Sequence, residues 1–286
     1  MSETNHVIVI GAGAAGMLAA IAAAREGAAV ELWEQNEKPG KKLFITGKGR
    51  CNVTNACDME ELLGSVVSNS KFLYSSFYGF TNQDMMDLLE QAGLRLKVER
   101  GNRVFPQSDK SSDVISALSA LLRQAGVRVC LNQKAEGLAV EEGVCKGVRC
   151  GGRIQTADRV IVATGGLSYP TTGSTGDGLK WAADSGHRLT ELSPALVPFV
   201  VKEPVVKELQ GLSLKNIEAT VMRGKKVIYR EFGEMLFTHY GVSGPVLLSA
   251  SSHAGKGLTK GPISLVIDLQ PALSKGQLDT RMLREI

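Results

Sequence analysis

His6-Val-Ile-Val-Ile10-Gly11-Ala-Gly13-Ala-Ala-Gly16 lies near the start of the sequence and decides the fold. The continuous apolar run that ends at Ile10 is typical of a central parallel strand that is buried on both faces. The glycines then turn the chain, and residues 14–26 are rich in Ala, Leu and Met, which favours a helix. A second strand is expected over residues 29–33. Together these segments predict a βαβ unit.

The GxGxxG pattern has a specific purpose where a strand passes into a helix. Gly11 permits the tight turn, Gly13 lets the backbone approach a pyrophosphate, and Gly16 lets helix and strand pack closely. Ala14 and Ala15 lie in the same turn. The amino terminus of the helix supplies amides and partial positive charge for phosphates. The pattern therefore predicts a dinucleotide site.

Glu34 follows at the end of the second predicted strand, with Gln35 beside it. A carboxylate at this place accepts hydrogen bonds from an adenosine ribose. It would repel a 2′-phosphate, which argues against NADP in this first site. FAD and NAD remain as candidates.

A later strand, at residues 160–162, is also followed by glycines, and this favours FAD. Residues 160–162 form a short apolar run, which Ala163-Thr164-Gly165-Gly166 follows, and Thr175-Gly176-Asp177-Gly178 precedes another expected helix. An NAD dehydrogenase has no need for such a strand, whereas flavoproteins of the glutathione-reductase type have one. Asp177 and the nearby amides are expected along the polar chain of a flavin.

Composition bounds the class of protein. The 286 residues carry a formal net charge of +4, and 43% are hydrophobic, as in a soluble globular protein. The basic residues are spread along the chain, which argues against a nucleic-acid surface. The apolar stretch 7–24 lacks a basic leader, so neither an export signal nor a membrane span is expected. Five cysteines without a CxxC pair, and four scattered histidines, suit a reducing compartment and argue against a metal site. We therefore expect a cytoplasmic protein.

Residues 1–193 are expected to form an FAD-binding Rossmann-like domain of the α/β class. Helices are expected at about 59–68, 71–78, 83–91 and 112–124, an antiparallel meander over 135–156, and a loop over 38–55. Prolines near residue 194 mark a change in composition, and alternating segments at 217–222 and 226–229 follow. Residues 194–286 are therefore expected to form a β-rich domain.

Three motifs resemble those of one bacterial flavoprotein family. They are Lys38-Pro-Gly-Lys-Lys-Leu-Phe-Ile-Thr-Gly-Lys-Gly-Arg-Cys-Asn-Val-Thr-Asn55, Ala163-Thr-Gly-Gly-Leu-Ser-Tyr-Pro170 with Gly173-Ser-Thr-Gly-Asp-Gly178, and Glu234-Met-Leu-Phe-Thr-His-Tyr-Gly-Val-Ser-Gly-Pro245. The family includes a bile-acid-reducing NAD(P)/FAD oxidoreductase and aminoacetone oxidase-like proteins. The resemblance implies a two-dinucleotide-fold flavoprotein whose FAD domain is interrupted by an inserted β-rich domain.

In that family the chain returns after the insert to complete the FAD domain. No matching glycine-rich segment occurs between Gly261 and Ile286. We therefore expect an incomplete FAD domain and an incomplete insert, and FAD bound weakly or not at all.

The resemblance also assigns residues to the cofactor. Glu34 would bind the ribose, and the backbone of Ala135 would meet the adenine. Other residues of the first motif are expected along the FAD path, with Arg50 holding a phosphate or stabilising negative charge on the flavin. These residues are Lys41, Lys42, Thr46, Gly49, Arg50, Cys51 and Asn52.

Candidates for reactive residues are few. His239 and Tyr169 are the candidate catalytic residues, His239 because its side chain titrates near neutral pH. A redox disulfide between Cys51 and Cys57 is disfavoured, because on a helix this spacing would place the two side chains about 140° apart. A thiol of Cys51 packed near the flavin is the preferred interpretation.

The function predicted from these residues is an FAD-dependent oxidoreductase. It would transfer hydride or electrons between NAD(P)H and a small organic substrate, with the flavin doing the chemistry. The resemblance suggests reduction of an activated carbon–carbon double bond, and oxidation of an amine or carbinol stays open. The alternatives are a non-catalytic flavin-binding redox sensor and an NAD-dependent dehydrogenase.

Overall fold

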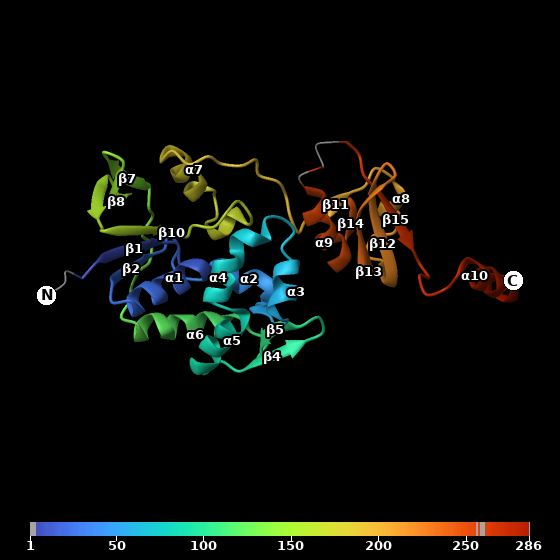
Figure 1. Cartoon of the computed structure of the whole chain (residues 1–286), viewed down its shortest axis with the longest axis horizontal. Helices are drawn as coiled ribbons and strands as arrows, with labels where there is room; N and C mark the ends of the chain where they lie inside the picture. The colour runs from blue at the N-terminus through green and yellow to red at the C-terminus, as the bar shows by residue number, and fades with distance from the viewer. Residues whose placement is uncertain (1–3, 256, 258–260, 286) are drawn as a thin grey trace. The chain divides into compact units, whose positions relative to one another are not determined.

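The computed structural model describes residues 4–255, 257 and 261–285, which divide into two compact units between Leu189 and Thr190 (Figure 1). The first unit contains a four-stranded sheet in which all pairings are parallel. Its strands, in order across the sheet, are β10 (Arg159–Val162), β1 (His6–Ile10), β2 (Ala29–Trp33) and β6 (Arg128–Cys130). The parallel pairing of β1 with β2, joined by a helix, confirms the predicted βαβ unit. The pairing of β10 with β1 confirms the strand predicted at residues 160–162.

Alternation along β1 divides the core of this unit into two layers. Val7 and Val9 pack on one face with the helices, while Ile8 and Ile10 pack on the other face with Trp181 and the small antiparallel sheet. Figure 1 shows the helices and the small sheet on opposite sides of the parallel strands. The helices are α1 (Ala14–Arg25) and α6 (Ser111–Gln124). The small sheet is β7 (Gly137–Glu141), β8 (Val144–Cys150) and β9 (Arg153–Thr156), and Trp181 belongs to α7 (Asp177–Asp184).

The segment between β2 and α6 is mostly helical. Its helices are α2 (Lys41–Ile45), η1 (Thr46–Gly49), α3 (Met59–Gly64), η2 (Ser70–Leu73), α4 (Tyr74–Gly79) and α5 (Asn82–Gln91). Thr81 caps the amino terminus of α5, in a reciprocal capping box with Asp84. A three-stranded antiparallel sheet of β3 (Thr54–Asn55), β5 (Arg103–Pro106) and β4 (Leu96–Glu99) completes this region.

Two local expectations are wrong. The loop expected over 38–55 contains α2, because Gly40 turns the chain at φ 71° and Leu43 then packs against the core. The single helix expected over 71–78 is divided between η2 and α4.

The second unit is built on a five-stranded sheet in the order β11-β14-β13-β12-β15. The long hairpin of β12 (Ser213–Arg223) and β13 (Lys226–Thr238) includes both predicted alternating segments. Its other elements are β11 (Phe199–Val200), α8 (Val205–Glu208), β14 (Gly241–Ser243), α9 (Pro245–Ala254), β15 (Ser264–Asp268) and α10 (Lys275–Glu285). A separate core around Ile217, Met235 and Leu247 supports this unit. Within the residues described, the structure has no helix long and apolar enough to cross a membrane.

Candidate nucleotide-binding site

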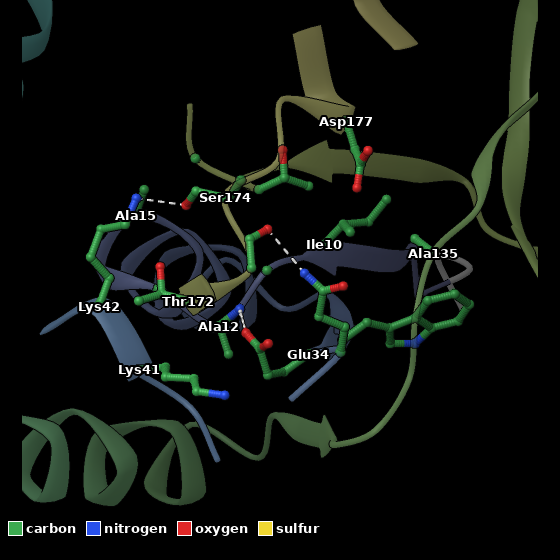
Figure 2. Close-up of a pocket in the computed structure, with 18 of the residues that line it drawn as sticks. Ile10, Ala12, Ala15, Glu34, Lys41, Lys42, Ala135, Thr172, Ser174 and Asp177 are labelled. Atoms are coloured by element: carbon green, nitrogen blue, oxygen red, sulfur yellow. Dashed lines mark hydrogen bonds between the residues drawn. The ribbon is translucent and has the colours of Figure 1, made fainter. Parts of the chain in front are cut away.

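A pocket of about 520 Å³ lies in the first unit, where β1, β2 and β10 end (Figure 2). The carboxyl ends of parallel strands are where open α/β sheets bind ligands. The pocket is lined by the glycine turn, the end of β2, α2, the segment before β7 and the loop after β10. The lining residues that the sequence predicted are Gly11, Gly13, Ala14, Ala15, Glu34, Gln35, Lys41, Lys42, Thr46, Ala135, Ala163, Thr164, Gly165 and Asp177.

The three glycines of the turn differ in what a side chain would meet. At Gly11, where φ is 103°, a Cβ would lie 2.5 Å from the carbonyl oxygen of Ala163 in the loop after β10. At Gly16 a Cβ would lie 1.8 Å from the carbonyl oxygen of Gly11. At Gly13 a Cβ would meet no protein atom within 4 Å. Gly11 and Gly16 therefore allow close packing, and Gly13 keeps the pocket open for a ligand.

The amino terminus of α1 faces this pocket. Its cap, Gly13, has no side chain to bond the first amides, and the first turn contains no acidic residue. The first amides of a helix have no partner within the helix and carry partial positive charge. This end of α1 is thus suited to a diphosphate.

Glu34 is a buried carboxylate at the end of β2, with only 8% of its surface exposed. Oε2 accepts a hydrogen bond from the Ala12 amide at 2.9 Å, as Figure 2 shows, and Oε1 accepts from the amide and the side chain of Asn36 at 2.9 and 2.7 Å. These bonds fix the carboxylate at the pocket wall.

Two lysines of α2 reach the pocket. Lys41 Nζ donates to Asn36 Oδ1 at 3.2 Å. Lys42 Nζ donates to Ser174 Oγ at 2.6 Å (Figure 2) and to Ser168 Oγ at 3.3 Å. Burial lowers the pKa of Lys42 from its ordinary value. Lys42 therefore connects α2 to the glycine-rich loop after β10 and contributes a cation to the same cavity.

The pocket also has apolar walls. Trp33 and Trp181 both line it and are almost fully buried, with Ile10 and Ala135 nearby in the same layer of the core. These are the only two tryptophans in the sequence. Aromatic residues in an apolar wall suit the binding of a purine ring.

Some predicted cofactor residues do not line the pocket, namely Gly16, Gly49, Arg50, Cys51, Asn52, Gly166 and Gly176. Arg50 is paired with the carboxylates of Glu99 and Asp109. Cys51 is buried in the helical layer of the core, which raises the pKa of its thiol. Both Cys51 and Cys57 are free thiols.

Sequence reasoning missed several lining residues. They are Ile10, Ala12, Trp33, Leu43, Gln133, Lys134, Val162, Thr172, Gly173, Ser174 and Trp181. Ile10, Ala12, Trp33 and Val162 adjoin predicted residues, so the motif spacing could have found them. Trp181 lines the pocket from α7. The sequence indicates this only through the position of Trp181 in the helix expected after the glycine-rich loop.

The two candidate catalytic residues lie in different units. Tyr169 is in the loop after β10, with φ 52° and 64% of its surface exposed, and it does not line the pocket. His239 is in the β13–β14 turn of the second unit, where its ring meets Tyr240 edge to face at 4.6 Å. Among residues 4–255, 257 and 261–285, no three His, Cys, Asp or Glu side chains gather as a metal site would require.

Fold and site together define a dinucleotide-binding protein with the Rossmann-type architecture of flavoproteins. The chain belongs to the HI0933-like family, because the sequence model of that family, the HI0933-like protein Rossmann domain, matches residues 5–254. This match confirms the predicted family resemblance.

Two relatives with established names are similar over most of the chain. The 3-dehydro-bile acid delta(4,6)-reductase of Clostridium scindens is 34% identical over 281 residues, which cover 96% of this chain and 66% of the reductase. The ribosomal RNA dihydrouridine synthase of Escherichia coli is 31% identical over 251 residues, which cover 88% of this chain and 61% of the synthase. The chain thus spans less than two thirds of the length of either relative.

Solved structures support the fold. The open conformation of a flavocytochrome c3 fumarate reductase has a TM-score of 0.51 at 24% identity, over 75% of this chain and 47% of that chain. A 3-ketosteroid delta1-dehydrogenase from Sterolibacterium denitrificans has a TM-score of 0.51 at 17% identity, over 74% of this chain and 62% of that chain. At these identities the likeness is evidence for the fold alone.

Proposed function

We propose that the chain is the FAD-binding part of an oxidoreductase that reduces a carbon–carbon double bond conjugated to a carbonyl group. The observation that carries this proposal is the pocket at the ends of β1, β2 and β10, where the amino terminus of α1, Glu34 and the glycine loop after β10 meet. That combination suits a dinucleotide whose second half follows the returning strand β10. FAD has this form.

The residues present suit the parts of FAD. The α1 amides would bind the diphosphate, in the space that a Cβ at Gly13 would fill. Glu34 would accept from the ribose hydroxyls, and Lys42 would contribute positive charge. Trp33 and Trp181 would exclude water from the adenine end. When bound, FAD would supply two-electron chemistry, accepting a hydride equivalent from a reduced nicotinamide and delivering it to a substrate carbon.

The proposed substrate class comes from the names of the relatives. Both names denote the saturation of a double bond, in a 3-dehydro bile acid for one and in a uridine of ribosomal RNA for the other. In each the double bond is conjugated to a carbonyl group, so one carbon accepts hydride and its neighbour accepts a proton. NAD(P)H would supply the hydride and leave as NAD(P)⁺. Tyr169 and His239 remain the proposed proton donors.

We propose a small molecule as the substrate, in line with the broadly spread basic residues. A uridine in RNA is the second candidate, which the similarity to the dihydrouridine synthase favours. Tyr74 and Tyr78 also form a stacked pair, 5.6 Å between ring centroids, with 49% and 60% of their surfaces exposed. Exposed aromatic rings of this kind stack with unpaired bases.

The test uses the position of both tryptophans at the pocket. FAD is titrated into the protein up to concentrations that reveal weak binding, while tryptophan fluorescence is recorded, and quenching is expected because Trp33 and Trp181 line the same cavity. NADH or NADPH is then added without oxygen, followed by an α,β-unsaturated ketone or by ribosomal RNA. Bleaching of the flavin bands by NAD(P)H, and their return with one substrate, would support the proposal and identify the substrate class.

The alternatives give different results. Flavin that binds but is never reduced by NAD(P)H would favour a non-catalytic redox sensor. NAD binding without FAD binding would favour an NAD-dependent dehydrogenase. Absence of both, at nucleotide concentrations high enough to reveal weak binding, would contradict the assignment of the pocket.

A further inference from the structure

Arg50 lies in the motif predicted to follow the cofactor, but its guanidinium contacts protein carboxylates. Nε donates to Asp109 Oδ1 at 2.7 Å, Nη2 lies 2.6 Å from the same oxygen, and Nη2 also pairs with Glu99 Oε1. Cζ lies 4.2 Å from the centroid of the Phe105 ring. One side chain thus joins loop 46–51 to the end of β4, to β5 and to the turn before α6.

Loop 46–51 needs such a restraint. Gly47, Lys48, Gly49 and Cys51 all have positive φ, at 57°, 58°, 85° and 58°. For Lys48 and Cys51 this backbone conformation is sterically unfavourable, and it persists only where the surrounding structure holds it. Cys51 is also pressed into the core, with 1% of its surface exposed. Arg50 lies between Gly49 and Cys51, and its side chain connects this part of the loop to the strands and the turn around it.

The other end of the loop belongs to the nucleotide pocket. Thr46 lines the pocket, and α2, which carries Lys41 and Lys42, ends immediately before it. The Cys51 amide donates to the Thr46 carbonyl oxygen at 3.1 Å, which closes the loop. A shift of the loop at Cys51 would therefore move Thr46 and the carboxyl end of α2.

We propose that Arg50 is a positioning residue, which clamps loop 46–51 against β4, β5 and the turn before α6 and so fixes Thr46 and α2 at the pocket. In this role it acts on the cofactor through the loop and does not touch it. The effect on FAD rests on the proposed function, whereas the effect on the loop does not.

Lys97 provides a matched control. Its Nζ contacts the same two carboxylates, Asp109 Oδ2 at 2.6 Å and Glu99 Oε1 at 3.5 Å, but it lies on β4 and not in the loop. A Lys97→Met variant removes one positive charge from the cluster, as Arg50→Met does. Only Arg50→Met releases the loop.

The experiment compares Arg50→Met, the isosteric double variant Glu99→Gln/Asp109→Asn, their combination and Lys97→Met. The alkylation rate of Cys51 is measured by mass spectrometry, with the other cysteines as internal references. The dissociation constant of FAD is measured by tryptophan quenching. Arg50→Lys is included because a lysine keeps the charge but cannot bridge both carboxylates with a planar fork.

Arg50→Met and Glu99→Gln/Asp109→Asn are each expected to raise Cys51 alkylation and weaken FAD binding by about tenfold or more. The combination is expected to add little, since both changes release the same loop. Lys97→Met should stay near wild type, and Arg50→Lys should fall between.

Two results would overturn the proposal. If Arg50→Met weakens FAD binding while Glu99→Gln/Asp109→Asn does not, and Cys51 stays protected in both, then Arg50 contacts the cofactor directly. If Cys51 alkylation is unchanged in every variant, then the loop does not depend on Arg50. A wild-type protein that fails to bind FAD would contradict the proposed function alone, because the alkylation comparison would still decide the role of Arg50.

Discussion

Gly13 has extended backbone angles, φ −81° and ψ −172°, which any residue can adopt. A Cβ there meets no protein atom within 4 Å, and the residue lines the pocket. Gly13→Val should therefore lower the melting temperature only slightly, because valine is a poorer helix cap than glycine, while weakening FAD binding at least about tenfold. Thermal unfolding and tryptophan quenching measure the two effects. Gly79→Val is the control, because Gly79 also has open space around it but lies at the end of α4, away from the pocket.

Gly16 has the opposite character. A Cβ there would lie 1.8 Å from the carbonyl oxygen of Gly11, which is backbone and cannot turn aside. Gly16→Ala should lower the free energy of unfolding by roughly 1–3 kcal/mol, because helix and turn must separate. Urea unfolding checks this value against Gly64→Ala, a helical glycine with open space. Equal stability of the two variants would show that α1 can move without cost.

At the scale of elements, the cluster that holds loop 46–51 gives a pH prediction. The hydrogen bond from Arg50 lowers the pKa of Glu99, and hydrogen bonds from Lys97 and then Arg50 lower that of Asp109. The charged forms are thus stabilised in the folded state. Their contribution is complete above the unfolded carboxyl range and is lost as the pH falls through the lowered folded pKa values, below about pH 4.

The measurement is urea unfolding between neutral and acid pH. The wild type should lose stability on acidification more steeply than Glu99→Gln/Asp109→Asn, because the variant has no carboxylates there to protonate. Parallel curves for the two proteins would contradict an ionic role for the cluster.

Sequence reasoning located the elements of the pocket better than the role of Arg50. Gly11, Gly13 and Glu34 belong to a local pattern in which spacing alone reports the chemistry. The partners of Arg50 lie 49 and 59 residues away along the chain, at Glu99 and Asp109. Such pairings depend on how β4 and the turn before α6 fold back, which local spacing does not encode. The sequence predicts a loop at α2 because glycine and lysine dominate that stretch. The helix depends on the packing of Leu43 against the core, which is a tertiary contact that local composition does not report.

At the scale of the whole molecule, the two units have separate cores, and both tryptophans belong to the first. Tryptophan fluorescence should therefore follow unfolding of the first unit, while circular dichroism follows both. FAD should raise only the transition seen by fluorescence, because a ligand stabilises the unit that binds it. Calorimetry with and without FAD checks this expectation. A single transition that shifts as a whole would show that the two units unfold together.

The contact between Gly11 and Ala163 has a consequence for synthesis. The Ala163 amide donates to the carbonyl oxygen of Ile10, and the carbonyl oxygen of Ala163 lies close to Gly11. The two strands that meet here are far apart in the sequence, since the hydrogen-bonded residues His6 and Asp158, at their amino-terminal ends, are separated by 152 residues. A ribosome adds about 5–20 residues per second, so roughly 8–30 s pass between the emergence of the glycine turn and that of its partner strand. During this interval β1 has one unpaired edge. The nascent chain is thus exposed to mispairing until β10 has been synthesised, and the nucleotide pocket cannot be completed before β10 and α7 have followed.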